Sequence, residues 1–295
     1  MHYNKTALPE PQLLMGLWNK GLRIDDPKSA TRALETIGYY RLLIYMRNFQ
    51  VPTSKRFFVG TKFSDIIELY DFDRHLRLLV LDGIERIEVS LRAALSSKIS
   101  ITHDPHWYMD VSHFDQHIPF VQSQQKIIFE TGPESKTRWI ALQHYYTHYT
   151  TPPLPASWTV MERLTFGVLS RFYAALKLPN RKLTEVVFGF DEKILVSWFH
   201  SISFLRNQCA HHGQLWNTKL NKFFALGPNA YRQDFLNANR NELYPRLVAM
   251  NLLLKNTFPE SQWGERLKGL VNGCRHVQPS SMGFPAGWET RPSWN

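Results

Sequence analysis

Apolar residues recur at three- and four-residue steps along almost the whole chain. The longest such segment runs from about residue 64 to residue 100 and contains Ile66, Tyr70, Leu76, Val80, Ile84, Ile87, Leu91 and Ala94 at that spacing. This period places the side chains on one face of an α-helix, with Ser64 as the expected N-cap. No alternating pattern of useful length predicts a strand. We therefore expect an all-α fold.

Shorter segments with the same period predict further helices at residues 10–20, 28–47, 117–130, 136–149, 158–177, 191–212, 241–257 and 260–274. The prolines at 151–155 must end the helix before them, because proline removes a backbone donor and fixes φ. Asp191 is the expected N-cap of the helix at 191–212, and Gly213 is its expected stop. The segment after residue 274 is rich in Pro and Gly, which predicts an irregular tail.

The charge of the chain is unevenly distributed. Its 295 residues include 35 Lys and Arg against 25 Asp and Glu, a formal net charge of +10. Residues 1–60 carry a net +5 and residues 201–295 a net +6, whereas residues 61–200 are almost neutral. Basic ends favour a polyanionic partner, of which nucleic acid is the commonest. The alternative interpretation is that the excess of basic residues only keeps the protein soluble.

Several classes of protein are excluded or disfavoured. Only two cysteines occur, Cys209 and Cys274, so a disulfide framework is excluded and a cytoplasmic location is expected. No apolar run approaches the ~20 residues that span a bilayer, and the first residues do not resemble a signal peptide. The sequence has no phosphate-binding loop, no dinucleotide fingerprint and no nucleophile elbow. We expect no cofactor, no metal and no association with a membrane.

The most informative segment for chemistry is FLRNQCAHHGQLWN, residues 204–217. On a helical wheel Ile194, Trp198, Ile202, Leu205, Cys209 and His212 fall within an arc of about 80°, which predicts a buried stripe. His200, Phe204, Asn207 and His211 fall on the opposite side, within roughly 60° of one another.

The two adjacent histidines of this segment have different expected roles. His212 continues the apolar stripe and is expected to pack in the core, whereas His211 is expected to face solvent or a partner. Arg206 lies about 140° from His211 on an ideal helix. To act on the same atom, Arg206 would reach round the helix, the helix would distort, or a second copy would complete the site. Both histidines can also be ordinary, because a histidine pair at a helix C-terminus interacts well with the helix dipole.

Four motifs, in order, resemble those of one protein family. They are IGYYRL at 37–42, the long helix at 72–92, the helix at 154–170 that follows a proline, and LRNQCAHHGQLWN at 205–217. Within the last, Arg206 and His211 match the R-x4-H form of the HEPN superfamily. The combination resembles the Abi-like (AbiD/AbiF) abortive-infection branch of that superfamily and covers about residues 10–220.

The resemblance implies a HEPN-type helical bundle with an N-terminal helical extension. We expect the extension at residues 1–60, the core at 61–220, and C-terminal helices with a basic tail at 221–295. It also implies an antiphage endoribonuclease that cleaves RNA without a metal and leaves a 2′,3′-cyclic phosphate. In that chemistry His211 transfers protons, Arg206 stabilises the phosphate charge and Asn207 orients His211 or binds a phosphate oxygen. His212 is their structural neighbour.

The resemblance further implies an RNA partner and a homodimer whose motif-bearing faces meet. Some members of this branch are bound and restrained by a small structured noncoding RNA. No DNA partner is expected. The candidate RNA-contacting residues are Phe204, Arg41, Lys219, Lys222 and Arg291. The alternative function is a non-catalytic RNA-binding protein in which the R-x4-H motif is structural or only contacts phosphate, and a protein–protein adaptor is a third hypothesis.

Three other groups of residues allow more than one interpretation. His103, His106, His113 and His117, with Asp104, Asp110 and Asp115, have metal-ligand spacings, but a solvated surface is expected. Glu85, Glu88 and Arg92 resemble an acidic helix face of that family, but a solvated ion-pair network is expected. In the tail, Trp288, Arg291 and Trp294 suit either RNA stacking or docking on the core.

Overall fold

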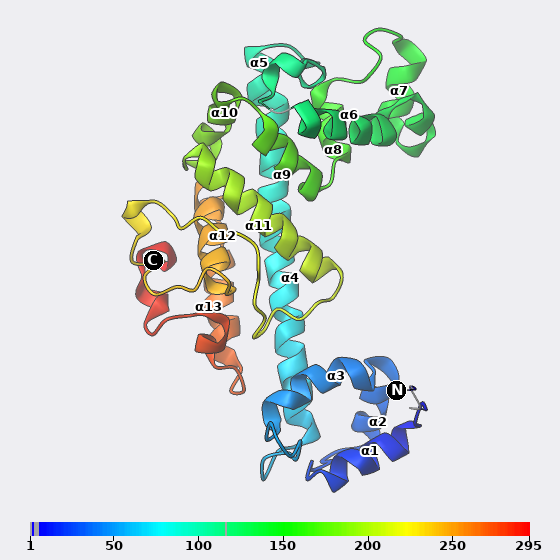
Figure 1. The fold of residues 1–295 in the computed structure, drawn as a ribbon, viewed down its shortest axis with the longest axis vertical. Coiled ribbons are helices and arrows are strands. Elements are labelled where there is room, and N and C mark those ends of the chain that lie inside the picture. The colour runs from blue at the N-terminus through cyan, green and yellow to red at the C-terminus, as the bar shows by residue number, and fades with distance from the viewer. Residues whose placement is uncertain (1, 3–5, 116) are drawn as a thin grey trace. The chain divides into compact units, whose positions relative to one another are not determined.

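The computed structural model describes residues 2, 6–115 and 117–295 of the chain. These residues form thirteen α-helices joined mostly by short 3-10 turns and irregular segments, without a β-strand (Figure 1). The predicted all-α fold is confirmed. Within the described residues, no helix is both long and apolar enough to cross a bilayer.

The chain divides into two compact units. The first holds the residues up to Leu76 together with Gly269–Gln278, and the second holds Arg77–Lys268 together with Pro279–Asn295. The division falls inside α4 (Phe63–Ala94) and inside α13 (Trp263–Gly273). The domain boundaries that we expect at residues 60 and 220 stay predictions.

The first unit contains α1 (Glu10–Asn19), α2 (Pro27–Thr36), α3 (Tyr39–Met46) and the beginning of α4. The single helix predicted at 28–47 is wrong, because Gly38 has φ +91° and separates α2 from α3. Ser64 is not the N-cap of α4, since the helix already begins at Phe63. Inside the unit, the hydroxyl of Tyr45 donates to the buried carboxylate of Asp73 over 2.7 Å.

The second unit contains the rest of α4 and most of the other helices. These are α5 (Ser100–Thr102), α6 (His117–Thr131), α7 (Ile140–His148), α8 (Ser157–Arg163), α9 (Phe166–Ala175), α10 (Leu178–Phe188), α11 (Glu192–Ala210) and α12 (Tyr244–Thr257), with the start of α13. The predicted α4 stripe is confirmed here, because Val80, Ile84, Ile87, Leu91 and Ala94 are all buried. No helix is expected between residues 177 and 191, yet α10 forms there, with a proline in its first turn, where proline is tolerated.

An ion pair on α4 explains why residues 158–177 form two helices instead of the one predicted. The guanidinium of Arg92 pairs with Glu88 and also donates to the carbonyl oxygens of Met161 (3.2 Å) and Leu164 (3.0 Å), where α8 ends. The prediction that this pair is solvated is wrong, since the Arg92 and Glu88 side chains are only 17% and 12% exposed. Arg92 thus satisfies carbonyls that a continuous helix would have bonded itself.

The C-terminal tail docks on the second unit. Trp288 and Trp294 are each only 2% exposed, and both rings lie against Tyr244 of α12. The backbone N–H of Ser293 donates to the buried carboxylate of Asp234 over 3.0 Å. Of the two interpretations of the tail, docking is therefore correct, and the two indole rings are not available for stacking on RNA.

Helix α13 approaches α4 closely at Gly83. The indole N–H of Trp263 donates to the carbonyl oxygen of Leu79 over 2.7 Å, and a Cβ placed at Gly83 would lie 2.7 Å from the same indole nitrogen. Glycine is therefore required at this position, even though it lowers intrinsic helix propensity.

Replacing Gly83 with Ala should lower the free energy of unfolding by about 1–3 kcal/mol, because the buried Trp263 ring must move. Gly269→Ala is the matched control, since a Cβ there meets nothing within 4 Å. We expect the control to gain up to ~1 kcal/mol from helix propensity. Urea unfolding followed by circular dichroism measures both variants, and equal effects would contradict the close packing.

Candidate functional site

Helix α11 carries the motif and is buried around most of its circumference. It contacts α9, α10 and α12 (Figure 1). Trp198, Ile202, Leu205 and Cys209 are buried, as predicted, and Ile194 is half-buried. Leu195, Ser197, Phe199, Ser201 and Ser203 are buried as well. Little of the helix surface is left for contact with a ligand.

One strip of α11 remains accessible. We call it the α11 strip, and it consists of Lys193, Val196, His200, Phe204, Asn207 and the C-cap residue His211. Lys193, His200, Asn207 and His211 are exposed, whereas Val196 and Phe204 are half-buried. The structure therefore brings four residues predicted from the helical wheel onto one face.

The end of α11 differs from the prediction. The helix ends at Ala210, and His212 has φ +58° in the left-handed region. The N–H of His212 donates to the carbonyl of Cys209 (3.0 Å) and that of Gly213 to the carbonyl of Gln208 (2.8 Å). This pattern is a Schellman motif with histidine in the position that glycine usually takes. The prediction that His212 packs in the core is wrong: the turn moves it off the apolar stripe, and it is exposed.

Contacts on two sides hold this turn in place. The buried Arg77 of α4 donates through Nη1 to the carbonyl oxygen of Gly213 over 3.5 Å. The side-chain amide of Gln208 donates to the carbonyl of Gln214 over 3.2 Å, and a Cβ at Gly213 would lie 2.5 Å from that amide nitrogen. The turn that displays His211 and His212 is therefore defined by packing as well as by its own hydrogen bonds.

Arg206 reaches round the helix toward the α11 strip. Its side chain leaves α11 beside the buried stripe, yet Nη1 donates to the Oδ1 atom of Asn207 over 3.4 Å. Which of the three ways brings Arg206 and His211 to the same atom stays a prediction. A guanidinium and an amide thus lie together one turn before His211.

Two cations from outside α11, Lys222 and Arg171, act on the α11 strip near Phe204 and His200. The ammonium of Lys222 is 5.5 Å from the ring centroid of Phe204, within the range of a cation–π interaction. Burial lowers the pKa of His200, and the charges of Lys222 and Arg171 lower it further. Two cations from other segments therefore act on one exposed imidazole of the strip.

Arg246 of α12 positions Lys222. Its guanidinium is fully buried and donates to the hydroxyl of Ser201 (2.9 Å) and to the carbonyl oxygens of Leu220 (3.0 Å) and Lys222 (2.9 Å). It also donates to the carbonyl oxygens of Arg240 and Glu242, both over 2.7 Å. These bonds attach the backbone at 220–222 to α11, which brings the Lys222 side chain over Phe204.

The other candidate RNA-contacting residues lie elsewhere. The ammonium of Lys219 pairs with Glu242, and Arg291 donates to the carbonyls of Gln233 (2.6 Å), Asp234 and Leu236, where it holds the tail. Arg41 belongs to the first unit and is half-buried. The structure thus places Lys222 over Phe204 of the α11 strip, whereas Lys219 and Arg291 make contacts within the fold. RNA contact by any of them stays a prediction.

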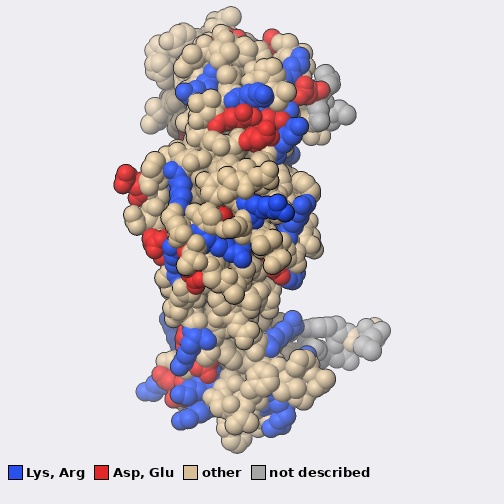
Figure 2. Space-filling view, turned by 90° about the vertical axis from the view of Figure 1, so that its left-hand side faces the viewer, with Lys and Arg blue, Asp and Glu red and all other residues tan. Residues whose placement is uncertain are grey.

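One signal in the sequence was missed. Between residues 193 and 241 there is a single acidic residue, Asp234, and it is buried. The same segment has six basic residues, Lys193, Arg206, Lys219, Lys222, Arg232 and Arg240. On the face of the molecule drawn in Figure 2, some groups of Lys and Arg lie among uncharged side chains and others lie beside Asp and Glu. With six basic residues and one acidic residue, the segment carries a net charge of +5.

One protein family matches the chain. The model of the Abi-like protein family matches residues 32–217, which include all of α11 and the turn that follows it. The chain belongs to the Abi-like family. No curated protein and no solved structure matches it. Membership of this family associates the chain with abortive-infection defence.

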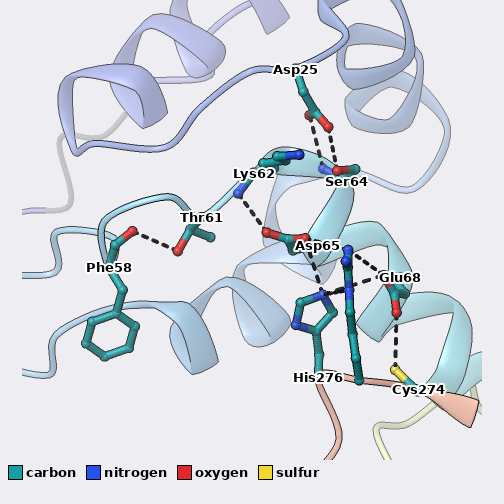
Figure 3. Close-up of polar contacts among 10 residues, drawn as sticks. Asp25, Phe58, Thr61, Lys62, Ser64, Asp65, Glu68, Cys274 and His276 are labelled. Atoms are coloured by element: carbon teal, nitrogen blue, oxygen red, sulfur yellow. Dashed lines mark hydrogen bonds and ion pairs between the residues drawn. The ribbon is translucent and has the colours of Figure 1, made fainter.

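A group of possible metal ligands lies in the first unit (Figure 3). Among the described residues, Asp65, Glu68 and His276 form the one group of three or more whose ligand atoms lie within 4.8 Å of one another. The guanidinium of Arg275 lies 3.0 Å from the carboxylate of Asp65 and 3.1 Å from that of Glu68. Since a cation of the chain already neutralises both carboxylates, ion pairing accounts for this cluster.

The histidine-rich segment after α5 forms no such group among the described residues. The rings of His103 and His113 lie 4.2 Å apart, and Nε2 of His103 bonds to the side chain of Asn180 over 2.8 Å. Burial and the charge of His103 lower the pKa of His113. Asp115 pairs with Arg181. The side chain of His117 lies outside the described residues.

Replacing Arg246 with Met should lower the free energy of unfolding by about 3 kcal/mol or more, because each buried acceptor left unpaired costs roughly 1–3 kcal/mol. Arg240→Met is the control, since Arg240 is an exposed arginine of the adjacent segment and a change of about 0.5 kcal/mol or less is expected. Denaturant titration measures both. A destabilisation by Arg246→Met no larger than that of the control would contradict the positioning role.

Replacing Lys222 with Ala should raise the pKa of His200, because a neighbouring positive charge disfavours the imidazolium. Burial and Arg171 remain, so the pKa should stay below its usual range. The lowered pKa also makes the folded protein lose stability as the pH falls through about 6.5, and the substitution should reduce that loss. Imidazole proton shifts measured by NMR against pH test this, and an unchanged or lower pKa would contradict it.

Proposed function

We propose that this Abi-like protein is a metal-independent endoribonuclease of abortive-infection defence, with Arg206, Asn207 and His211 at its catalytic site. The observation that carries the proposal is the α11 strip, which ends in an exposed histidine beside an arginine–asparagine contact. No Asp or Glu occurs between Lys193 and Ala210. A polyanion can therefore approach along this strip without meeting a carboxylate of the same helix.

The residues suit cleavage by the 2′-hydroxyl of the RNA itself. His211 takes the proton of the 2′-hydroxyl while its oxygen attacks the adjacent phosphorus. The bond from phosphorus to the 5′-oxygen breaks, and a second group gives that oxygen a proton. The products are a 2′,3′-cyclic phosphate and a 5′-hydroxyl. Arg206 stabilises the negative charge that builds up on the phosphate oxygens, and Asn207 orients the guanidinium or bonds to phosphate.

The second proton-transfer group has two candidate sources. One is His211 of a second copy, with two α11 strips facing each other in a homodimer. The other is His212 of the same chain, which the Schellman turn exposes next to His211. We favour the homodimer, because it places two guanidinium groups around one phosphate and covers the half-buried Phe204. A small structured RNA bound on the same face would restrain the activity by occupying the strip.

Arg206→Ala and His211→Ala should each reduce cleavage of single-stranded RNA by about 100-fold or more, because each removes a group that acts in the transition state. His144→Ala is the control, since His144 is an exposed histidine of α7 outside the strip. Cleavage is measured with end-labelled RNA in EDTA, and the cyclic phosphate is identified by its resistance to phosphatase until acid opens it. Circular dichroism confirms that the variants fold.

Several results would contradict the proposal. Full activity of the Arg206→Ala/His211→Ala double variant would place the chemistry elsewhere. Absence of cleavage by the unaltered protein, together with tight and salt-sensitive RNA binding, would favour the non-catalytic RNA-binding protein. The proposed regulatory RNA is tested by extracting RNA from the purified protein and separating it on a gel. A discrete band of one size is expected.

A further inference from the structure

A groove opens beside the N-terminal half of α11. It has a volume of about 440 Å³ and lies among α6, α9 and α11. The residues that matter for its chemistry are Gln122 and Lys126 of α6, Val168, Arg171 and Ala174 of α9, and Val196 of α11. All of them belong to the second unit.

The lining combines small apolar side chains with two uncompensated cations. Val168 is buried and Val196 half-buried, whereas Lys126 and Arg171 are exposed. No Asp or Glu lines the groove. Within the described part of the chain neither cation has an ion pair, and the contact made by Lys126 is a cation–π contact, 5.0 Å from the ring centroid of Phe129. Such a surface attracts an anion and has no carboxylate to repel it.

The groove is continuous with the α11 strip. Val196 belongs to both, and Arg171 is close enough to His200 to lower the pKa of its imidazole together with Lys222. From Val196 the strip continues past Phe204 to His211, about 22 Å along the helix axis. A single-stranded nucleic acid of several nucleotides can therefore contact the groove and His211 at the same time.

We infer that this groove binds the phosphodiester backbone of single-stranded RNA, several nucleotides away from the bond cut at His211. Lys126 and Arg171 contact phosphate oxygens, and the apolar floor accommodates a ribose or base face. The identity of the anion as RNA rests on the proposed function. The assignment of the groove as an anion site rests on its two cations, Lys126 of α6 and Arg171 of α9, and on its position beside α11. Binding in the groove favours RNA substrates that are long enough to contact the groove and His211 at the same time.

The test measures RNA binding without cleavage, in protein that carries His211→Ala. Fluorescence anisotropy compares single-stranded RNAs of about 2 and about 12 nucleotides between about 50 and 200 mM salt. The test variant is Lys126→Glu/Arg171→Glu, with Lys126→Ala/Arg171→Ala as a milder second variant. Lys182→Glu is the control, because Lys182 is an exposed lysine of α10 that does not line the groove.

We expect the groove variants to bind the longer RNA at least about ten-fold more weakly than the control. The slope of log affinity against log salt should become shallower by about 0.7 for each phosphate that the variant no longer neutralises. The shorter RNA can occupy the groove or the end of the strip at His211, but not both at once. Its affinity should therefore fall by a smaller factor than that of the longer RNA, and the advantage of the longer RNA should shrink. Longer RNA bound as tightly by the groove variants as by the control would overturn the inference, as would an equal weakening for both lengths.

Cleavage of a dinucleotide separates this inference from the proposed function. A dinucleotide bound at His211 cannot reach the groove. Its cleavage therefore reports on the His211 site, and His211→Ala should abolish this cleavage in protein whose groove is intact. If cleavage depends on His211 but the groove variants leave length-dependent binding unchanged, the inference about the groove is wrong and the proposed nuclease stands. If the groove variants lose length-dependent binding but neither the unaltered protein nor any variant cleaves RNA, the inference about the groove is supported and the proposed nuclease activity is contradicted.

Discussion

The site depends on one buried guanidinium. Arg246 is fully buried and donates five hydrogen bonds, one to Ser201 on α11 and four to carbonyl oxygens of residues 220–242. Burial lowers its pKa to about 10, so the group stays charged at neutral pH. Removing that charge from water is costly, and the five bonds together with the face of Phe224, 5.2 Å away, offset the cost. The partners of Arg246 are neutral oxygen atoms, so no carboxylate is needed to hold its guanidinium. The positive charge of Lys222 beside it is therefore not offset by such a carboxylate.

The packing of α11 limits where chemistry can occur. With α9, α10 and α12 against it, the helix leaves only one strip exposed. Arg206 joins the strip through its contact with Asn207. Lys222 and Arg171 approach Phe204 and His200 of the strip from other segments of the second unit. The site is thus a line of groups along one helix and not an enclosed pocket. This arrangement suits a long polyanion better than a small substrate.

Much of this could be predicted from the sequence, because it depends on helical periodicity alone. The buried positions Trp198, Ile202 and Leu205 follow from the period, and so do His200, Phe204, Asn207 and His211 on the opposite face. The family could also be predicted, because the four motifs are specific and the Abi-like family model matches residues 32–217.

The errors arise where the backbone leaves the helix or where partners are distant in sequence. A helical wheel places His212 in the core because it continues through a residue that in fact adopts the left-handed conformation. The Arg92 bonds to Met161 and Leu164, which separate α8 from α9, join residues about seventy positions apart. The acceptors of Arg246 are likewise up to 45 positions away. Periodicity carries no information about such pairs.

Cross-linking of bound RNA to the protein tests the central claim most directly. RNA that co-purifies with the His211→Ala protein, or a single-stranded RNA added to it, is cross-linked by ultraviolet light, and the modified peptides are identified by mass spectrometry. The account predicts cross-links in α11 around His200 and Phe204, with further ones in the parts of α6 and α9 that line the groove. Cross-links confined to the first unit or to the C-terminal tail, with none in α11, would contradict it.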